Sequence, residues 1–215
     1  MDCMEGMKQF PDKYFELAII DPPYGIGENG STNKNRTKLA KAKDYKSFYG
    51  GDKKSPDKEY FDELKRVSKN QIIWGANHFI SKMPLDSSCW IVWNKENGDS
   101  DFADCELAWA SFKSAVRKID FRWAGMLQGN MKEKEIRIHP TQKPVQLYQW
   151  LLKNYAKKGD KILDTHAGSA SSLIACHELG FDYIGFELDK EYFSKATERL
   201  ELVKAQISIF DFVER

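Results

Sequence analysis

The chain has 215 residues, of which 41% are hydrophobic and 13% aromatic, enough for one sizeable domain with its own core. Its net charge is +1 (33 basic against 32 acidic residues), so the global charge does not indicate whether the partner is an anion. The four cysteines are scattered with no C-x-x-C spacing, which argues against a disulfide framework or a zinc site. Without a signal peptide or a membrane-length apolar run, we expect a soluble, cytoplasmic protein.

The first two thirds of the sequence predict several strands and two irregular segments. A short helix or turn and then a strand are expected within residues 1–24, and a helix is expected from Asp57. Further strands are expected at 71–74, 89–93 and 105–110. The segments 25–56 and 113–138 are basic and irregular, and a loop as long as the first is uncommon unless it is functional.

The last third of the sequence has the clearest pattern. A helix with one apolar face is expected from Pro144, and a strand at 161–163 leads into a turn of small residues. The helix after that turn is expected to end at Gly180, with a strand at 183–186 and a last helix beyond it. This β-α-β-α order predicts a parallel sheet with right-handed crossovers.

One candidate site is the tetrapeptide Asp21-Pro22-Pro23-Tyr24, which closes an apolar run at 17–20. The run predicts a buried strand, and the two prolines predict a stiff loop with fixed carbonyl directions. A carboxylate, carbonyl acceptors and an aromatic face then meet at the carboxyl end of a strand, where α/β sheets place their ligands. Such a set can hold an exocyclic amino group, whose hydrogens bond to the oxygens while its heterocycle stacks on Tyr24.

A second candidate site is the strand-to-helix turn from Asp164 to Ser169, whose small residues allow close approach to the backbone. Glu187 follows 23 residues after Asp164, at the end of the next predicted strand, where nucleotide-binding folds often place an acid for ribose hydroxyls. The turn lacks the G-x-G-x-x-G pattern, and its leading acid would repel a pyrophosphate. That acid suits a cationic ligand such as S-adenosylmethionine.

Three motifs, taken in order, resemble those of the DNA N6-adenine and N4-cytosine methyltransferases. They are Asp-Pro-Pro-Tyr at 21–24, His-Pro-Thr-Gln-Lys-Pro at 139–144 and Asp-Thr-His-Ala-Gly-Ser at 164–169. The catalytic motif comes first and the cofactor motifs last, as in that family's permuted beta arrangement. The resemblance covers nearly the whole chain and implies a Rossmann-like α/β methyltransferase fold, with a mostly parallel sheet and helices on both faces. We expect a single domain, 1–215, with a target-recognition region at about 113–138.

The resemblance also implies which residues form the site. Catalytic roles fall to Asp21, Pro22, Pro23 and Tyr24. S-adenosylmethionine is expected to contact Asp2, Cys3, Asp21, His139, Thr141, Lys143, Asp164, His166, Ala167, Gly168, Ser169, Glu187 and Leu188. No metal is expected, because His166 and His177 have no neighbouring ligands in the sequence.

The activity implied is transfer of a methyl group to N6 of a flipped-out adenine in double-stranded DNA. DNA contacts are expected from Lys34, Arg36, Lys38, Lys41 and Lys43, and a homodimer is one way to extend a short recognition region. Cytosine-N4 methylation is the main alternative, because both targets are exocyclic amines. Ala170, in place of a usual glycine, also leaves open a cofactor-impaired DNA-binding protein. No Pro-Cys dipeptide supports a cytosine-C5 mechanism.

Overall fold

The fold is built on a seven-stranded sheet in the order β5-β3-β4-β2-β1-β8-β9. The computed structural model describes residues 1–27, 52–83, 86–98, 103–124, 127–132 and 134–213. The strands are β1 (Phe15–Ile20), β2 (Ser68–Trp74), β3 (Cys89–Asn94), β4 (Cys105–Ala110), β5 (Arg117–Asp120), β8 (Lys161–Asp164) and β9 (Asp182–Gly185). Every neighbouring pair is parallel except the two that involve β4.

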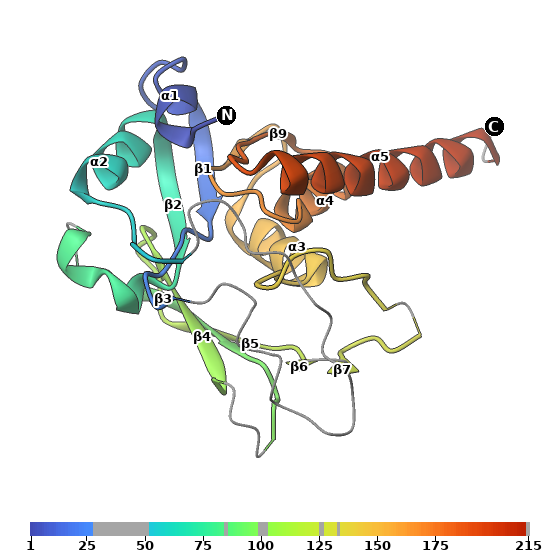
Figure 1. Ribbon diagram of the computed structural model, residues 1–215, viewed down its shortest axis with the longest axis horizontal. Coiled ribbons are helices and arrows are strands. Elements are labelled where there is room, and N and C mark those ends of the chain that lie inside the picture. Colours follow the sequence, from blue (N-terminus) through green and yellow to red (C-terminus); the bar gives the residue numbers. More distant parts are fainter. Residues whose placement is uncertain (28–51, 84–85, 99–102, 125–126, 133, 214–215) are drawn as a thin grey trace.

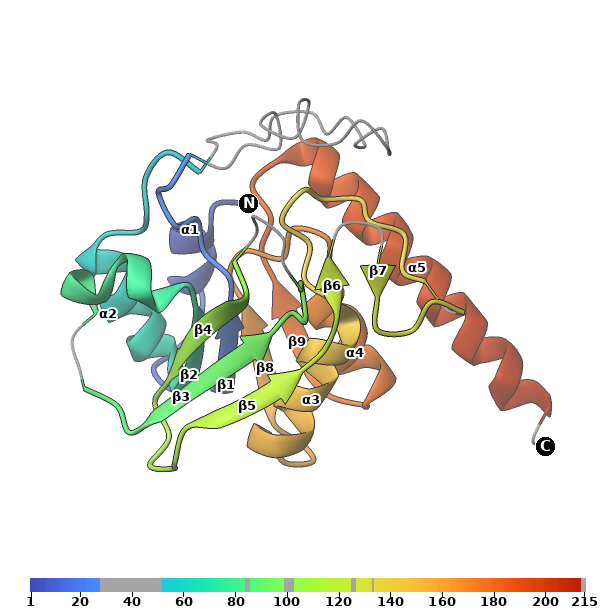
Figure 2. The same cartoon turned by 90° about the horizontal axis from the view of Figure 1, so that it is seen from below.

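Helices cover both faces of this sheet, as Figures 1 and 2 show. They are α1 (Cys3–Met7), α2 (Lys58–Val67), α3 (Val145–Tyr155), α4 (Ser171–Glu178) and α5 (Lys190–Val213), with 3-10 turns at Ala76–His78 and Ile80–Lys82. Residues of α1 and α2 share one buried cluster with one face of β1 and β2, while α3 and α4 share a second cluster with the opposite face. The sheet is therefore buried on both sides, as parallel sheets generally are.

Sequence and local chemistry explain where several helices begin and end. Asp57 caps α2 by accepting the backbone N–H of Tyr60, and Asp2 caps α1 in the same way. Gly180, with φ of 72°, follows the last turn of α4 in the left-handed region that favours glycine. The far end of α5 extends away from the rest of the molecule (Figure 1).

The predicted α/β fold is confirmed, but the interpretation of 113–138 as wholly irregular is wrong. Residues 117–120 form β5, which pairs in parallel with β3 at the edge of the main sheet. A two-stranded ribbon, β6 (Trp123–Ala124) and β7 (Leu127–Gln128), follows. β5 was missed because its strand has only one apolar residue, Ile119, as suits a half-exposed edge. Among the described residues, no helix is long and apolar enough to cross a membrane.

Candidate active site

Both candidate motifs lie at the carboxyl ends of neighbouring strands. β1 and β8 pair in parallel, with Ala18 opposite Leu163, so the loops that begin at Asp21 and Asp164 leave the same edge of the sheet. The negative charge of Asp21 contributes to the raised pKa of Asp164. This edge is where an open α/β sheet binds its ligands.

The Asp21 carboxylate is held by two contacts. Its Oδ1 accepts a hydrogen bond from the Tyr24 hydroxyl at 2.8 Å, and its Oδ2 lies 2.6 Å from Nζ of Lys143. Burial raises the pKa of Asp21; the Lys143 ammonium opposes this shift and the Glu106 carboxylate adds to it. Pro22 is buried beside it and begins the stiff turn that the sequence predicted.

The ring of Tyr24 contacts two residues that follow β2, His78 and Gly75. The imidazole of His78 stacks on it, with the ring centroids 5.0 Å apart and the planes 16° from parallel. The ring also lies against Gly75, where an added Cβ would be 2.1 Å from Cε1 of Tyr24. Gly75 has φ of 68°, so both its backbone and the close ring require glycine. Tyr24 is thus fixed in place, and His78 is a neighbour that the sequence did not predict.

Glu106 is a partly buried acidic member of the site that sequence reasoning missed. It lies on β4, and its Oε2 is 2.9 Å from Nζ of Lys143, while its Oε1 forms an ion pair with Lys95. Burial acts to raise the pKa of Glu106, but Lys143 and Lys95 outweigh it and lower the pKa to about 2. The signal was present, since Glu106 is an isolated acid in an otherwise apolar strand.

Asp164 is a buried carboxylate whose two side-chain partners among the described residues are neutral. Its Oδ1 accepts the backbone N–H of His166 at 3.0 Å, and its Oδ2 accepts the Ser172 hydroxyl. Within the described part of the chain the structure gives it no cationic partner, and burial raises its pKa to about 7. A buried carboxylate in this state fits a positively charged ligand, because ionisation here needs a compensating charge.

The turn after Asp164 keeps its backbone close to the end of β9. The N–H of Ala167 donates to the Phe186 carbonyl at 2.8 Å. His166 is partly buried, and its Nδ1 lies 2.9 Å from the Thr165 hydroxyl. Burial lowers the pKa of His166 to about 4, which favours the neutral imidazole. Ala170 adopts φ of 60°, a left-handed conformation that costs an alanine about 1–2 kcal/mol. The backbone is therefore strained at Ala170, where the motif that this turn resembles has a glycine.

The Glu187 carboxylate also contacts this turn. Its Oε2 accepts the N–H of Gly168 at 2.8 Å and its Oε1 accepts the N–H of Asp189 at 2.8 Å. Burial raises the pKa of Glu187, and these backbone bonds partly offset that effect. The next residue, Leu188, has an exposed side chain.

The N-terminal residues Asp2 and Cys3 lie near this turn. Burial, together with the charges of Asp2 and Glu187, raises the pKa of the Cys3 thiol to about 12. Asp2 also acts electrostatically on His166. The structure thus brings Asp2 and Cys3 close to the turn after Asp164, and the sequence assigned both segments to one cofactor site.

The segment 139–144 divides between two places. His139 lies edge-on to Tyr192 of α5, with the ring centroids 4.4 Å apart, and its Nδ1 is 3.0 Å from the Thr141 hydroxyl. Burial lowers the pKa of His139 to about 4. Lys143 instead directs its ammonium group to Asp21, so the structure associates it with the catalytic motif.

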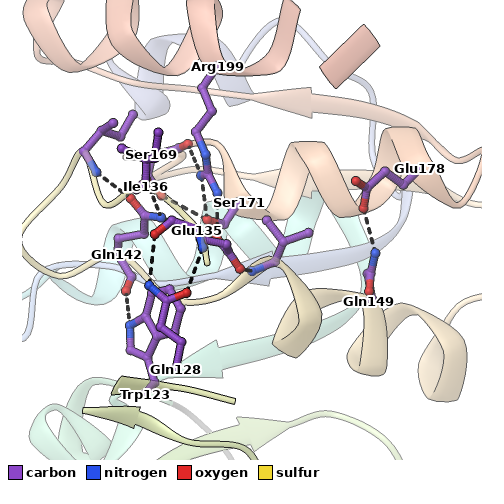
Figure 3. A network of polar contacts seen from close by, with 12 residues as sticks. Trp123, Gln128, Glu135, Ile136, Gln142, Gln149, Ser169, Ser171, Glu178 and Arg199 are labelled. Atoms are coloured by element: carbon purple, nitrogen blue, oxygen red, sulfur yellow. Dashed lines mark hydrogen bonds and ion pairs between the residues drawn. The ribbon is translucent and has the colours of Figure 1, made fainter. Parts of the chain in front are cut away.

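A polar network connects the segment around Glu135 to the turn after Asp164 (Figure 3). Arg199 of α5 donates to the Ser169 carbonyl at 2.7 Å and to the Ser171 hydroxyl at 2.9 Å. Its other terminal nitrogen lies 2.7 Å from Oε2 of Glu135, whose Oε1 accepts the first N–H of α3, that of Val145, at 2.8 Å. Arg199 therefore fixes Ser169 from outside the turn, a role that the sequence did not predict.

Two further expectations concern DNA and metals. The predicted DNA contacts Lys34, Arg36, Lys38, Lys41 and Lys43 lie outside the described residues. In the described ranges, no group of three or more His, Cys, Asp or Glu side chains could hold a metal ion.

Comparison with solved structures identifies the class of fold. The chain shares it with the M1.HpyAVI–SAM complex (TM-score 0.54, 23% identity, 93% of this chain and 96% of that one). It also shares it with the cytosine-N4-specific PvuII DNA methyltransferase (TM-score 0.60, 12% identity, 96% and 90%). The fold is that of the DNA methyltransferases.

The family follows from the sequence comparisons. A family model described as DNA methylase, for the N6 and N4 enzymes, matches residues 15–198, and the chain belongs to this family. It is 25% identical over 251 residues to the Type II methyltransferase M.HinfI of Haemophilus influenzae, covering 94% of this chain and 67% of that protein. It is equally similar to the Type II methyltransferase M.HpaI of Haemophilus parainfluenzae, covering 99% and 76%.

Proposed function

We propose that this DNA methyltransferase uses S-adenosylmethionine to methylate N6 of adenine in a flipped-out base. The observation that carries the proposal is the Asp21 carboxylate at the end of β1, on the same edge of the sheet as Asp164, a buried carboxylate to which the described residues give neutral partners. The first suits the amino group of a base, and the second suits the ammonium group of a cationic methyl donor, whose sulfonium methyl group would be transferred to the amino nitrogen.

The residues around Asp164 fit S-adenosylmethionine. Asp164 would hold its ammonium group, and Glu187 would accept its ribose hydroxyls. The N–H of Gly168 already orients the Glu187 carboxylate at 2.8 Å. When bound, the cofactor supplies a methyl group made electrophilic by a sulfonium. The structures of M1.HpyAVI and of TTHA0409 from Thermus thermophilus, each a complex with this molecule, share the fold and support the assignment.

Asp21 and the Pro22 carbonyl would activate the amino nitrogen. The lone pair of a base amino group is delocalised into its ring, which makes the nitrogen a poor nucleophile. Hydrogen bonds from both amino hydrogens to these two oxygens favour a pyramidal nitrogen and free the lone pair. Holding the nitrogen in line with the methyl group adds an orientation effect. Asp21 would also accept the proton that the methylated nitrogen releases.

The choice of adenine rests on Asp21 itself, since an aspartate before Pro-Pro favours adenine within the family that the motifs resemble. The experiment is long-read modification sequencing of DNA from cells that express the protein, with mass spectrometry of the nucleosides. N6-methyladenine in one sequence context is the expected result. N4-methylcytosine would establish the alternative reaction. Unmodified DNA, with no cofactor binding by calorimetry, would identify a cofactor-impaired DNA-binding protein.

We also propose that the basic segment 25–56 contacts DNA phosphates around the flipped base, because it follows directly after Tyr24 in the sequence. Neutralising Lys34, Lys38 and Lys41 should weaken DNA binding and flatten its salt dependence, by roughly 0.9 log-log slope units per lost contact. The control is neutralisation of Lys153, Lys157 and Lys158, which are exposed near the C-terminal end of α3. An unchanged slope in the loop variant would direct the search for the DNA-binding face to 113–137.

A further inference from the structure

The ammonium group of Lys143 is buried between two carboxylates at the centre of the site. Its Nζ lies 2.6 Å from Oδ2 of Asp21, 2.9 Å from Oε2 of Glu106 and 3.0 Å from the Tyr24 hydroxyl. Only 5% of its side chain is exposed. An ammonium has three hydrogens to donate, and here three oxygens are in place to accept them.

This arrangement places Lys143 in competition with the proposed substrate. Both Asp21 oxygens already accept a hydrogen bond, one from Tyr24 and one from Lys143. An incoming amino hydrogen must share Oδ2 with the ammonium or replace it there. Glu106 offers the ammonium a second carboxylate at nearly the same distance, so Lys143 can keep an ionic partner while Asp21 is used.

The charges of the cluster balance only when both lysines are present. Asp21 and Glu106 carry two negative charges, and Lys143 and Lys95 carry two positive ones. Without Lys143, Glu106 would keep Lys95 as its partner, whereas Asp21 would keep only the Tyr24 hydroxyl. Asp21 would then be the group that takes up a proton, and a protonated carboxyl donates where it must accept.

We propose that Lys143 and Glu106 are positioning residues of the methyl-transfer reaction: Lys143 keeps Asp21 ionised and oriented, and Glu106 draws the ammonium away so that Asp21 can accept the amino group. This inference rests on the proposed function and deepens it. It assigns Lys143 to the acceptor base, where sequence reasoning assigned it to the cofactor, and it gives Glu106 a role for the first time.

Other titratable groups also face Asp21, and they set the direction of the expected pH effects. Tyr148 of α3 and Asp164 of β8 both interact with it electrostatically, as does Tyr24 in its own loop. None of these is a cation. Burial and Glu106 raise the pKa of Asp21, while Lys143 and, to a smaller extent, the hydrogen bond from Tyr24 lower it. Removing Lys143 and removing Glu106 must therefore shift the pKa of Asp21 in opposite directions.

The experiment measures single-turnover methyl transfer across about pH 5 to 9 for the wild type and for Lys143→Met, Lys143→Arg and Glu106→Gln. Lys143→Met should transfer methyl groups at least tenfold more slowly at neutral pH and recover the rate as the pH rises. The reason is that the acid limb of its pH–rate profile moves to higher pH. Glu106→Gln should move the acid limb down and lower the plateau, because Asp21 now holds the ammonium alone. Lys143→Arg keeps the charge and should keep the wild-type limb.

Cofactor binding by calorimetry and thermal unfolding serve as controls for folding. If Lys143→Met does not fold, the downward shift of the acid limb in Glu106→Gln and the unchanged limb in Lys143→Arg still carry the test. The inference is overturned if Lys143→Met loses rate equally at every pH, or if both substitutions move the limb the same way. A wild type that methylates no base amino group would instead refute the proposed function.

Discussion

The buried carboxylate of Asp164 should make the cofactor-free protein less stable as the pH rises. Burial raises its pKa from 3.8 to about 7 in the folded chain. A carboxyl with a higher pKa in the folded than in the unfolded state binds its proton more tightly when folded. Stability therefore falls as the pH rises from about 4 to about 7, and the full shift of about three units corresponds to at most roughly 4 kcal/mol.

Asp164→Asn removes this dependence while keeping the shape of the side chain. An amide oxygen can still accept the N–H of His166, which lies 3.0 Å from Oδ1 in the wild type. We expect the free energy of unfolding of the variant, relative to that of the wild type, to rise by roughly 2–3 kcal/mol from about pH 5 to about pH 8. Urea unfolding at the two pH values measures this, with the exposed Asp182→Asn as control.

The same substitution should weaken cofactor binding. A charge-assisted hydrogen bond to the ammonium contributes about 1.5–3 kcal/mol, so Asp164→Asn should bind S-adenosylmethionine at least tenfold more weakly. Wild-type binding should tighten as the pH rises through about 7, since a cation prefers the ionised carboxylate. The reasoning fails if the gap in stability between Asp164→Asn and the wild type is equal at both pH values, or if cofactor affinity is unchanged.

Two further substitutions test the backbone of the site. Gly75→Ala should lower methyl transfer at least tenfold without changing cofactor affinity, because its Cβ would lie 2.1 Å from the Tyr24 ring; Gly98→Ala, with φ of 62° and open space around it, is the control. Equal losses in both variants would remove the ring contact as the cause. Ala170→Gly should raise the free energy of unfolding by about 0.5–1 kcal/mol by relieving its left-handed backbone, whereas Ala156→Gly, with φ of −109°, should lower it by a similar amount. Urea unfolding checks both, and a loss of stability in Ala170→Gly would show that the strain is absent.

The parts of the fold that local pattern determines were predictable. The apolar run before Asp21, the amphipathic helix after Pro144 and the strand before Asp164 all appear where the sequence indicated. These elements are buried, so their periodicity is strong. β5 was missed because an edge strand needs little apolar sequence, and the pairing of β4 against its neighbours depends on contacts far apart in the chain.

The site was predictable only where a motif is contiguous. Asp21 and Tyr24 are neighbours in sequence and were found together, as were the residues of the Asp164 turn. Glu106 meets Lys143 across 37 positions that include the three short strands β5, β6 and β7 and an irregular segment, and no spacing rule brings such a pair together. Contacts of this kind are set by tertiary packing. The same reason explains why the hydrogen bond from Arg199 to Ser169 was not predicted.

The central claim is that Asp21 accepts the amino group of the target base, and single-turnover methyl transfer by Asp21→Ala tests it most directly. With DNA and S-adenosylmethionine saturating, we expect transfer to fall by at least about a hundredfold, the effect of removing an oriented hydrogen-bonding group from a reacting centre. Cofactor affinity measured by calorimetry should stay close to that of the wild type, because Asp164 and Glu187 are untouched. Substantial residual transfer, or a loss of cofactor binding that accounts for the whole effect, would contradict the claim.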